Sequence, residues 1–232
     1  MTPGIFVTGT DTEVGKTYIS ALIAKQLHTQ GVNVGVYKPA ASGCIDNADG
    51  SLYSEDADTL WNAAGKPATV NHVCPQMFQA PIAPHLSAKA EGKEINRELL
   101  IRGVEYWQQN SDFIIVEGAG GLMSPISDQD FVADLAYQFG FPLIIVVANK
   151  LGCINQTLQT LITAASYEDG IPIAGIILNN VTPADSEDLS LALNPTEIER
   201  VCIPPVLATV NFQQGLSHKI DWLQLVQPEA GA

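Results

Sequence analysis

The residues best suited to chemistry lie in "GTDTEVGKT" (9–17), directly after the apolar run "IFVTG" (5–9). A phosphate-binding loop has four residues between its first glycine and the Gly-Lys pair, whereas this segment has five. In the strand–loop–helix context, loop N–H groups and the helix N-terminus would surround a β-phosphate. The residues expected to contact the nucleotide here are Glu13, Val14, Gly15, Lys16, Thr17 and Tyr18, with Lys16 on the β/γ oxygens and the Thr17 hydroxyl on Mg²⁺.

A second acidic position follows in "DFIIVEGAGG" (112–121), an apolar strand that ends in Glu117. Folds with a phosphate-binding loop place a carboxylate for Mg²⁺ at such a strand end. Alone, an acid at a strand end is more often a solvated loop residue, and its pairing with Thr17 favours the metal. The glycines after Glu117 do not form a dinucleotide fingerprint, because the third glycine would fall at Met123.

Two nucleotide-dependent classes are disfavoured by single positions. In "VVANKLG" (146–152), the motif Asn-Lys-x-Asp that reads guanine has Gly152 in place of its aspartate. Partitioning-type ATPase switches carry a second lysine five positions before Lys16, and that position is Asp11. An acid there would repel the γ-phosphate of a partner's nucleotide, so neither a GTPase nor such a switch is favoured.

The elements that must position these residues follow an α/β pattern. Continuous apolar runs rich in Ile and Val suit strands that are buried on both faces of a parallel sheet. The runs are residues 5–9, 32–39, 112–118, 142–149, 172–180 and 204–210. Helical spacing appears between them at Ile19, Ile23 and Leu27, and again at Leu158, Leu161, Ile162 and Ala165. The pattern predicts a doubly wound, mainly parallel sheet of the P-loop NTPase type, with helices on both faces.

The chain is predicted to be a single domain over residues 1–232, with one insertion and a short tail. Residues 44–93 are rich in Gly, Pro, Asn and Asp, and within them only residues 55–64 have a helical pattern. A long insertion in a compact domain is usually functional or mobile. Residues 227–232 are expected to be a flexible tail.

Composition limits the possible partners and the compartment. The formal net charge of −14 repels nucleic acid and anionic membranes, so neither is an expected partner. The N-terminus lacks a signal-peptide pattern and no apolar stretch is long enough to span a bilayer, which predicts a cytoplasmic protein. The four cysteines form no CxxC pair, so neither a zinc site nor a redox pair is indicated.

Taken together, "FVTGTDTEVGKT", "YKPAASG", "VEGAGG", "NKLGCIN" and "NNVTP" resemble the dethiobiotin synthetases, the ATP-dependent enzymes of biotin biosynthesis. The segments keep the family's order and spacing from Phe6 to about Pro183, and a five-residue loop is normal in that family. The resemblance implies that 7,8-diaminopelargonate, CO₂ and ATP give dethiobiotin, ADP and phosphate. One amine takes up CO₂ as a carbamate, ATP phosphorylates it, and the second amine closes the ureido ring on the mixed anhydride.

The resemblance also implies roles for individual residues. Lys38 would contact the carbamate and the γ-phosphate and act in catalysis together with Lys16 and Thr12. Asp56 would be the remaining Mg²⁺ ligand, although the helical stretch alone does not choose among Glu55, Asp56 and Asp58. Further contacts implied for the substrate are Thr12, Ser42, Gly118 and Gly121, and those implied for the nucleotide are Asn179 and Pro205.

The segment "LGCINQ" (151–156) opens a predicted helix, and free N–H groups at a helix N-terminus can bind an anion. The resemblance implies a homodimer with active sites at its interface, in which this turn binds the substrate carboxylate in the neighbouring subunit. The residues implied are Gly152, Cys153, Ile154 and Asn155. Without the resemblance, the same residues simply begin a helix.

Two alternative functions stay open at this point. One is a P-loop ATPase switch that binds a protein partner, which would hydrolyse ATP without the diamine. The other is a cobyric-acid-type amide ligase, which shares this domain but normally also carries a glutaminase domain, for which 232 residues leave no room.

Overall fold

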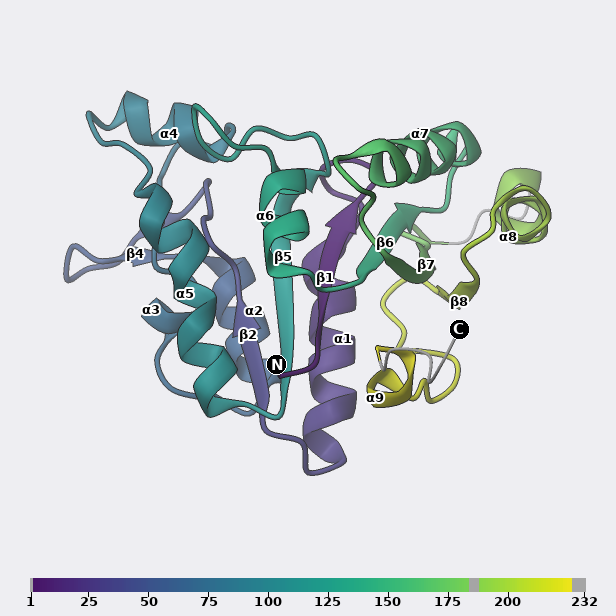
Figure 1. Cartoon of the computed structure of the whole chain (residues 1–232), viewed down its shortest axis with the longest axis horizontal. Helices are drawn as coiled ribbons and strands as arrows, with labels where there is room; N and C mark the ends of the chain where they lie inside the picture. Colours follow the sequence, from purple (N-terminus) through teal and green to yellow (C-terminus); the bar gives the residue numbers. More distant parts are fainter. Residues whose placement is uncertain (1, 184–187, 227–232) are drawn as a thin grey trace.

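The computed structural model describes residues 2–183 and 188–226, so the predicted tail at 227–232 lies outside the described residues. The fold is built on one six-stranded sheet whose neighbouring strands all pair in parallel (Figure 1). In spatial order the strands are β2 (Val34–Tyr37), β5 (Phe113–Gly121), β1 (Gly4–Gly9), β6 (Leu143–Ala148), β7 (Ile173–Asn179) and β8 (Val206–Val210). The predicted doubly wound parallel sheet is confirmed.

The strands are apolar without alternation because both faces of the sheet are covered. Every residue of β1 and of β6 is buried, as expected for central parallel strands. All six predicted runs form strands, but β5 continues through Gly121, beyond the predicted end at residue 118. Its pairing with β1 shifts register between Val7 and Gly9, so an irregular extension follows Glu117.

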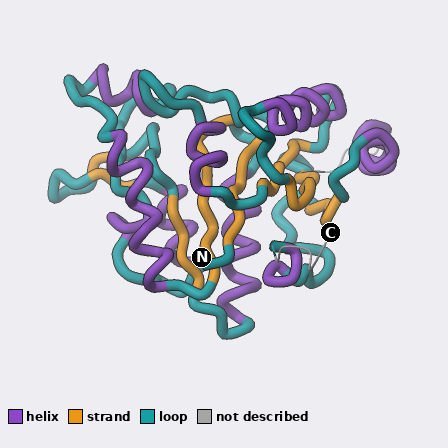
Figure 2. Tube along the Cα trace, viewed as in Figure 1, coloured by secondary structure: helices purple, strands orange, loops and turns teal. Residues whose placement is uncertain are grey.

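Helices cover the two faces of the sheet (Figures 1 and 2). Helices α1 (Lys16–Thr29) and α2 (Glu55–Ala63) contact each other on one face, and α5 (Arg97–Asn110) and α6 (Val132–Phe139) contact each other on the opposite face. Further along the chain are α7 (Cys153–Ser166), α8 (Leu189–Val201) and the short α9 (Trp222–Leu225). The predicted face of α1 is buried through Ile19, Ile23 and Leu27. None of the described helices combines the length and the hydropathy of a membrane-crossing segment.

The insertion contains more secondary structure than the sequence predicts. Besides the predicted helix, which is α2, it contains the strand pair β3 (Ile45–Asp46) and β4 (Leu52–Tyr53) and the helices α3 (Val70–Val73) and α4 (Pro84–Ala90). The prediction of a single helix in 44–93 was therefore wrong. Four residues are too few to show a helical period, and α4 begins with a proline inside a segment that reads as a turn.

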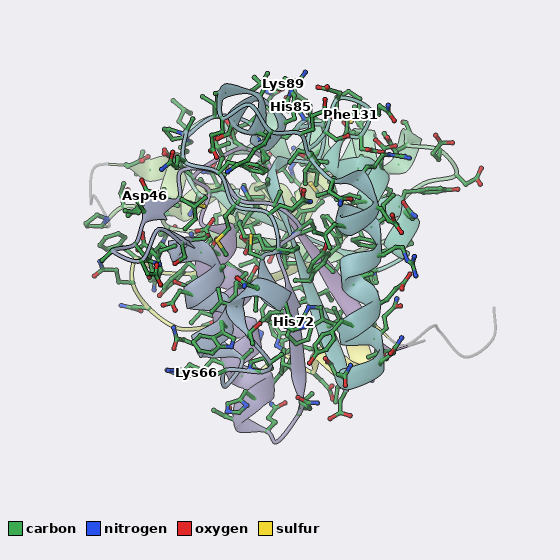
Figure 3. All side chains as sticks on the ribbon, turned by 90° about the vertical axis from the view of Figure 1, so that its left-hand side faces the viewer. Asp46, Lys66, His72, His85, Lys89 and Phe131 are labelled. Atoms are coloured by element: carbon green, nitrogen blue, oxygen red, sulfur yellow. The ribbon has the colours of Figure 1, made fainter. Side chains whose placement is uncertain are left out.

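The insertion is held to the rest of the fold at two places. The Lys38 N–H donates to the Val73 carbonyl at 2.8 Å, and Ala41 pairs in parallel with Met77. At the opposite edge of the insertion, the ammonium of Lys89 lies 2.6 Å from Asp128, in the turn before α6. Figure 3 shows Lys89 at the same end of the molecule as Phe131. The insertion therefore forms one wall of the region beyond the carboxyl ends of β1, β2 and β5.

Candidate active site

A cleft of about 630 Å³ opens beyond the carboxyl ends of β1, β2 and β5. This is the edge at which doubly wound folds bind ligands. The cleft brings together nine of the residues singled out from the sequence: Thr12, Glu13, Gly15, Lys16, Thr17, Lys38, Ser42, Asp56 and Glu117. These residues come from the loop after β1, the end of β2, the insertion and β5, so the fold assembles them from four separate segments.

The loop after β1 has the local geometry of a phosphate site. Gly15 adopts a φ of 88°, which favours glycine, and a Cβ at this position would collide with the Asn179 amide. Glu13 also has a positive φ, 56°, which is a strained conformation for a residue with a side chain. Helix α1 begins directly after Gly15, so its first N–H groups face the loop. The five-residue spacing therefore still produces a compact turn onto a helix N-terminus.

Lys16 is folded back over this loop. Its Nζ donates to the carbonyl of Asp11 at 3.0 Å, and the residue is largely buried. Burial lowers the pKa of Lys16, while the negative charge of Glu117 opposes that decrease. The ammonium is thus already positioned at the centre of the loop, where phosphate oxygens would replace the carbonyl.

The floor of the cleft is a network of charged groups around Glu117, which is fully buried. One carboxylate oxygen of Glu117, Oε1, accepts from the Thr17 hydroxyl at 2.7 Å and from Lys38 Nζ at 2.6 Å. The same Nζ lies 2.9 Å from Oδ2 of the half-exposed Asp56. Burial alone would lower the pKa of Lys38, but Glu117 and Asp56 raise it, so this lysine carries a positive charge between two carboxylates.

The oxygen atoms of this network fit a magnesium ion. Within the described part of the chain, Oε2 of Glu117 is buried and has no hydrogen-bond partner, so it can still accept a ligand. Burial alone would raise the pKa of Asp56, but Lys38 holds it below its usual value, and the group is a carboxylate at neutral pH. No cluster of three acidic, histidine or cysteine ligands forms among residues 2–183 and 188–226. Mg²⁺ in nucleotide sites needs only one or two carboxylates, because phosphates and water complete its shell.

Asn179 and Pro205, both implied for the nucleotide, lie in different places. Asn179 ends β7, and its side-chain amide donates to the Val14 carbonyl at 3.0 Å. This hydrogen bond fixes the loop to the end of β7. Pro205 precedes β8, and its carbonyl accepts from Ile176. Because Asn179 pairs with Val210 and Ile176 with Val206, Pro205 lies near the opposite end of these strands. At ~3.3 Å per residue, it is roughly 10 Å or more along the strand from the loop. The assignment of Pro205 to the nucleotide site is therefore corrected.

The glycines after Glu117 line the cleft differently from the prediction. Ala119 and Gly120 face the cleft, whereas Gly118 and Gly121 are not among its lining residues. A Cβ at Gly118 would come 2.7 Å from Val132 Cγ1, so this glycine permits close packing of α6. The N–H of Gly121 donates to the Ser124 hydroxyl at 2.9 Å.

Several lining residues were missed from the sequence. They are small or apolar, and no role was predicted for them, although Ala40 and Ala41 lie within "YKPAASG": Ala40, Ala41, the segment 81–84, Ser124 and Pro125. The Pro-rich segment "APIAPH" (80–85) was the available signal, since a long insertion beside a site often forms its wall.

The turn that opens α7 does not line the cleft of its own chain. Gly152 caps the helix with a φ of 94°, Cys153 is buried and Asn155 is exposed. The nearest link to the phosphate loop is a long contact of 3.4 Å from the Gln156 amide to Asp11. Within one chain, the structure therefore does not bring residues 152–155 together with Lys38.

Comparisons with known proteins agree on both the fold and the family. A family model described as an AAA domain matches residues 3–219. The MinC:MinD cell division complex of Aquifex aeolicus superposes with a TM-score of 0.54 at 15% identity, over 91% of this chain and 82% of the other. A ParA family ATPase of Chlorobium tepidum gives 0.52 at 19% identity, over 90% and 84%. At these identities the likeness shows the fold alone.

Sequence similarity is much higher to one group of enzymes. The chain is 43% identical over 220 residues to the ATP-dependent dethiobiotin synthetase BioD of Rhodopirellula baltica, covering 90% of this chain and 84% of the relative. It is 39% identical to the BioD protein of Bacillus subtilis, covering 88% and 85%, and 35% identical to that of Anaeromyxobacter dehalogenans, covering 93% of each. This similarity along nearly the whole length shows that the chain belongs to the dethiobiotin synthetase family.

Proposed function

We propose that this chain is a carboxylating cyclo-ligase, which forms the ureido ring of dethiobiotin from 7,8-diaminopelargonate, CO₂ and ATP. The observation that carries the proposal is the convergence of Lys16, Lys38, Asp56 and Glu117 on one cleft, within a chain of the dethiobiotin synthetase family. Two cations and two carboxylates suit a reaction in which a nucleotide and an anionic acceptor meet. The ATPase switch is less well supported, because Asp11 stands where such proteins need a lysine.

The phosphate side of the reaction relies on groups already in place. The loop N–H groups and the start of α1 bind the β-phosphate, and Lys16 contacts the oxygens between the β- and γ-phosphates. Because Lys16 now bonds only a carbonyl of its own loop, it can exchange that contact for phosphate oxygens with little movement. Preorganised charge of this kind stabilises the transferring phosphoryl group more than the ground state.

The acceptor side relies on Lys38, Thr12 and Ser42, which line the same cleft. An amine of the diamine attacks CO₂ and loses a proton, giving a carbamate whose negative charge Lys38 neutralises. A carbamate oxygen then attacks the γ-phosphorus and ADP leaves, which produces a carbamic–phosphoric anhydride. The second amine attacks the carbonyl carbon, phosphate departs, and the ring closes. Glu13, at the mouth of the cleft, is suited to pair with a substrate ammonium.

The metal would be held by Thr17, Asp56 and Glu117, whose oxygens are of the kind Mg²⁺ prefers. When bound, the ion neutralises charge on the β- and γ-phosphates during transfer. The protein's own part is to hold the three oxygens together, and the hydrogen bond of 2.7 Å from Thr17 to Glu117 supports that role.

The test is ADP release measured with and without diaminopelargonate and bicarbonate, with mass spectrometry of the product. We expect release to depend on both co-substrates and ¹³C from labelled bicarbonate to enter the product as one carbonyl carbon. ADP release that is equally fast without the diamine would contradict the synthetase and favour a switch.

We further propose that the active enzyme is a homodimer in which the turn opening α7 binds the carboxylate of the substrate held by the other subunit. Two observations support this. Residues 152–155 lie outside the cleft of their own chain, and the surface of α7 and α8 carries exposed apolar side chains. These side chains are Leu151, which is 87% exposed, and Ile162, Leu189 and Leu193. A face of this kind suits an isologous contact between two copies.

Mixed dimers test the shared site. A Lys16→Ala chain is refolded together with a Gly152→Pro chain, each inactive alone. Random pairing makes about half of the dimers mixed, each with one intact site if the turn acts in trans, so activity should return to about a quarter of wild type. Sedimentation confirms that dimers are present. Mixed dimers that form and stay inactive would place the carboxylate site within one chain.

A further inference from the structure

The proposed role of Lys38 as a carbamate ligand does not explain why its ammonium lies between two carboxylates. Its Nζ is not directed into open space for a substrate but is held between the two carboxylates assigned to the metal, at 2.6 Å from Glu117 and 2.9 Å from Asp56. The lysine side chain and that of Glu117 are both buried. A cation is therefore already bonded to Oε1 of Glu117 and Oδ2 of Asp56, the two carboxylates that a second cation needs, while Oε2 of Glu117 has no hydrogen-bond partner among the described residues.

We propose that Lys38 is a built-in counter-ion, which occupies the ligand pair Asp56 and Glu117 until the metal–nucleotide complex displaces its ammonium toward the acceptor. This inference rests on the proposed magnesium site. It gives one side chain two successive positions: between the carboxylates before the nucleotide binds, and on the carbamate and γ-phosphate afterwards.

Electrostatics explains why a resident cation is needed. Glu117 is completely buried, and a buried carboxylate without a partner is costly. Thr17 supplies one hydrogen bond to it, but a hydroxyl does not neutralise its charge. Lys38 supplies the positive charge, and the paired carboxylates in turn keep Lys38 protonated. The charge of Glu117 is thus balanced without a divalent ion, although its Oε2 has no hydrogen-bond partner among the described residues.

The same arrangement couples two binding events. A divalent ion reaching Asp56 and Glu117 weakens the hold of both carboxylates on Lys38, because their charge is then shared with the ion. The freed ammonium lies in the cleft that also contains Thr12 and Ser42, where the acceptor would bind. Lys16 has no such position, since its Nζ bonds the Asp11 carbonyl and not a carboxylate. It therefore provides a matched control.

Metal binding without nucleotide measures the competition directly. Free Mn²⁺ is titrated by electron paramagnetic resonance into wild type, Lys38→Met and Lys16→Met. Lys38→Met should bind Mn²⁺ at least about tenfold more tightly than wild type, because charged hydrogen bonds to both carboxylates no longer compete. Lys16→Met should gain much less, because Lys16 interacts with Glu117 and Asp56 only through longer-range charge and bonds neither carboxylate. The double variant Lys38→Met/Glu117→Gln should lose the gain.

The outcomes separate this inference from the metal site on which it rests. Equal Mn²⁺ affinity for Lys38→Met and wild type, with weaker binding of Mn²⁺ and a non-hydrolysable ATP analogue in Glu117→Gln, would overturn the counter-ion and leave the metal site intact. Unchanged binding of Mn²⁺ and analogue in both Glu117→Gln and Asp56→Asn would overturn the metal site itself.

A second measurement uses the wild-type chain, in case Lys38→Met does not fold. A buried, paired ammonium exchanges its protons slowly, so ¹⁵N-lysine labelling should give a resonance for Lys38 Nζ, assigned by its loss in Lys38→Arg. Addition of Mg²⁺ with the non-hydrolysable ATP analogue should shift or broaden this resonance beyond detection. A resonance that stays unchanged while the nucleotide binds would show that Lys38 does not move, and would overturn the proposal.

Discussion

The two halves of the sheet support the nucleotide loop in different ways. On the side of β2 and β5, buried charges contact one another directly, with Glu117 bonded to Thr17 and Lys38. On the side of β7 and β8, the contacts are hydrogen bonds of neutral side-chain amides. Asn179 holds the loop carbonyl of Val14, and Asn180 donates to Asn211 at 3.0 Å in an exposed position.

The charged side of the sheet suits catalysis, and the amide side suits recognition of the nucleotide. Charges in a buried setting interact strongly and tolerate little displacement, which suits phosphoryl transfer. An amide carries both donors and an acceptor, and exposed amides can reorient at low cost, which suits contact with a base. We therefore expect changes on the charged side to alter turnover and changes on the amide side to alter affinity for the nucleotide.

The largest effect is expected at Lys16. Lys16→Ala should lower kcat on the order of 10²–10³-fold or more, because a preorganised cation on the transferring group is lost. Thermal unfolding should change little, since Lys16 bonds only an adjacent loop carbonyl. Near-normal turnover would contradict the phosphate-loop assignment.

Lys38→Ala should reduce turnover to a similar degree while sparing much of the affinity for ATP. Unlike Lys16→Ala, it should also destabilise the fold, by ~3–5 kcal/mol, because Glu117 is left buried and unpaired. Urea unfolding measures the stability, and isothermal titration measures ATP binding. The double variant Lys38→Ala/Glu117→Gln should recover part of the stability but not the activity. A collapse of ATP affinity would instead make Lys38 a nucleotide residue.

Asp56→Asn should raise the Mg²⁺ concentration needed for half-maximal activity about tenfold or more, since changes in a metal site commonly cost this much affinity. Glu55→Gln is the matched control, because Glu55 is exposed and the Lys38 ammonium contacts Asp56 instead. A magnesium titration that shifts for Glu55→Gln and not for Asp56→Asn would move the ligand by one residue.

The smallest effect is expected on the amide side. Asn179→Ala removes one buried hydrogen bond to the loop, worth about 1 kcal/mol, so KM for ATP should rise about fivefold with kcat nearly unchanged. Pro205→Ala, at the far end of β8, should leave both constants as in wild type. If Asn179→Ala lowered kcat as strongly as Lys38→Ala, the contrast between the two halves would be lost.

The charged half was largely predictable from the sequence, and the reason is local. Lys16 and Thr17 belong to a contiguous motif, and Glu117 stands in the apolar run that forms the buried strand β5. Asp56 could not be chosen from its helix alone, because Glu55 and Asp58 share the same turn. The structure distinguishes the three by their contacts: Glu55 is exposed, Asp58 accepts from Asn62 and Tyr53, and Asp56 lies 2.9 Å from Lys38.

The place of Pro205, the short helices of the insertion and the role of residues 152–155 depend on information that a single sequence does not contain. The resemblance implies Pro205 for the nucleotide, but the register of β7 with β8 decides which end of the strand reaches the loop. Helices α3 and α4 are too short to produce a periodic pattern, and tertiary contacts stabilise short helices instead; α3, for example, contacts α2 and β2. Whether residues 152–155 serve a neighbouring subunit depends on contacts between chains, which strand and helix patterns do not encode.

The backbone hydrogen bonds between residues 38–41 and 73–77 make the opening of the insertion measurable at the end of β2. The backbone N–H of Lys38 is bonded to Val73, and that of Ala41 to Gln76. These amide protons can exchange with deuterium only when the insertion separates from the sheet, so their protection reports the free energy of that local opening. If the insertion opens to admit the diamine, both amides should exchange faster than those in the middle of β1, and a bound substrate should slow them together.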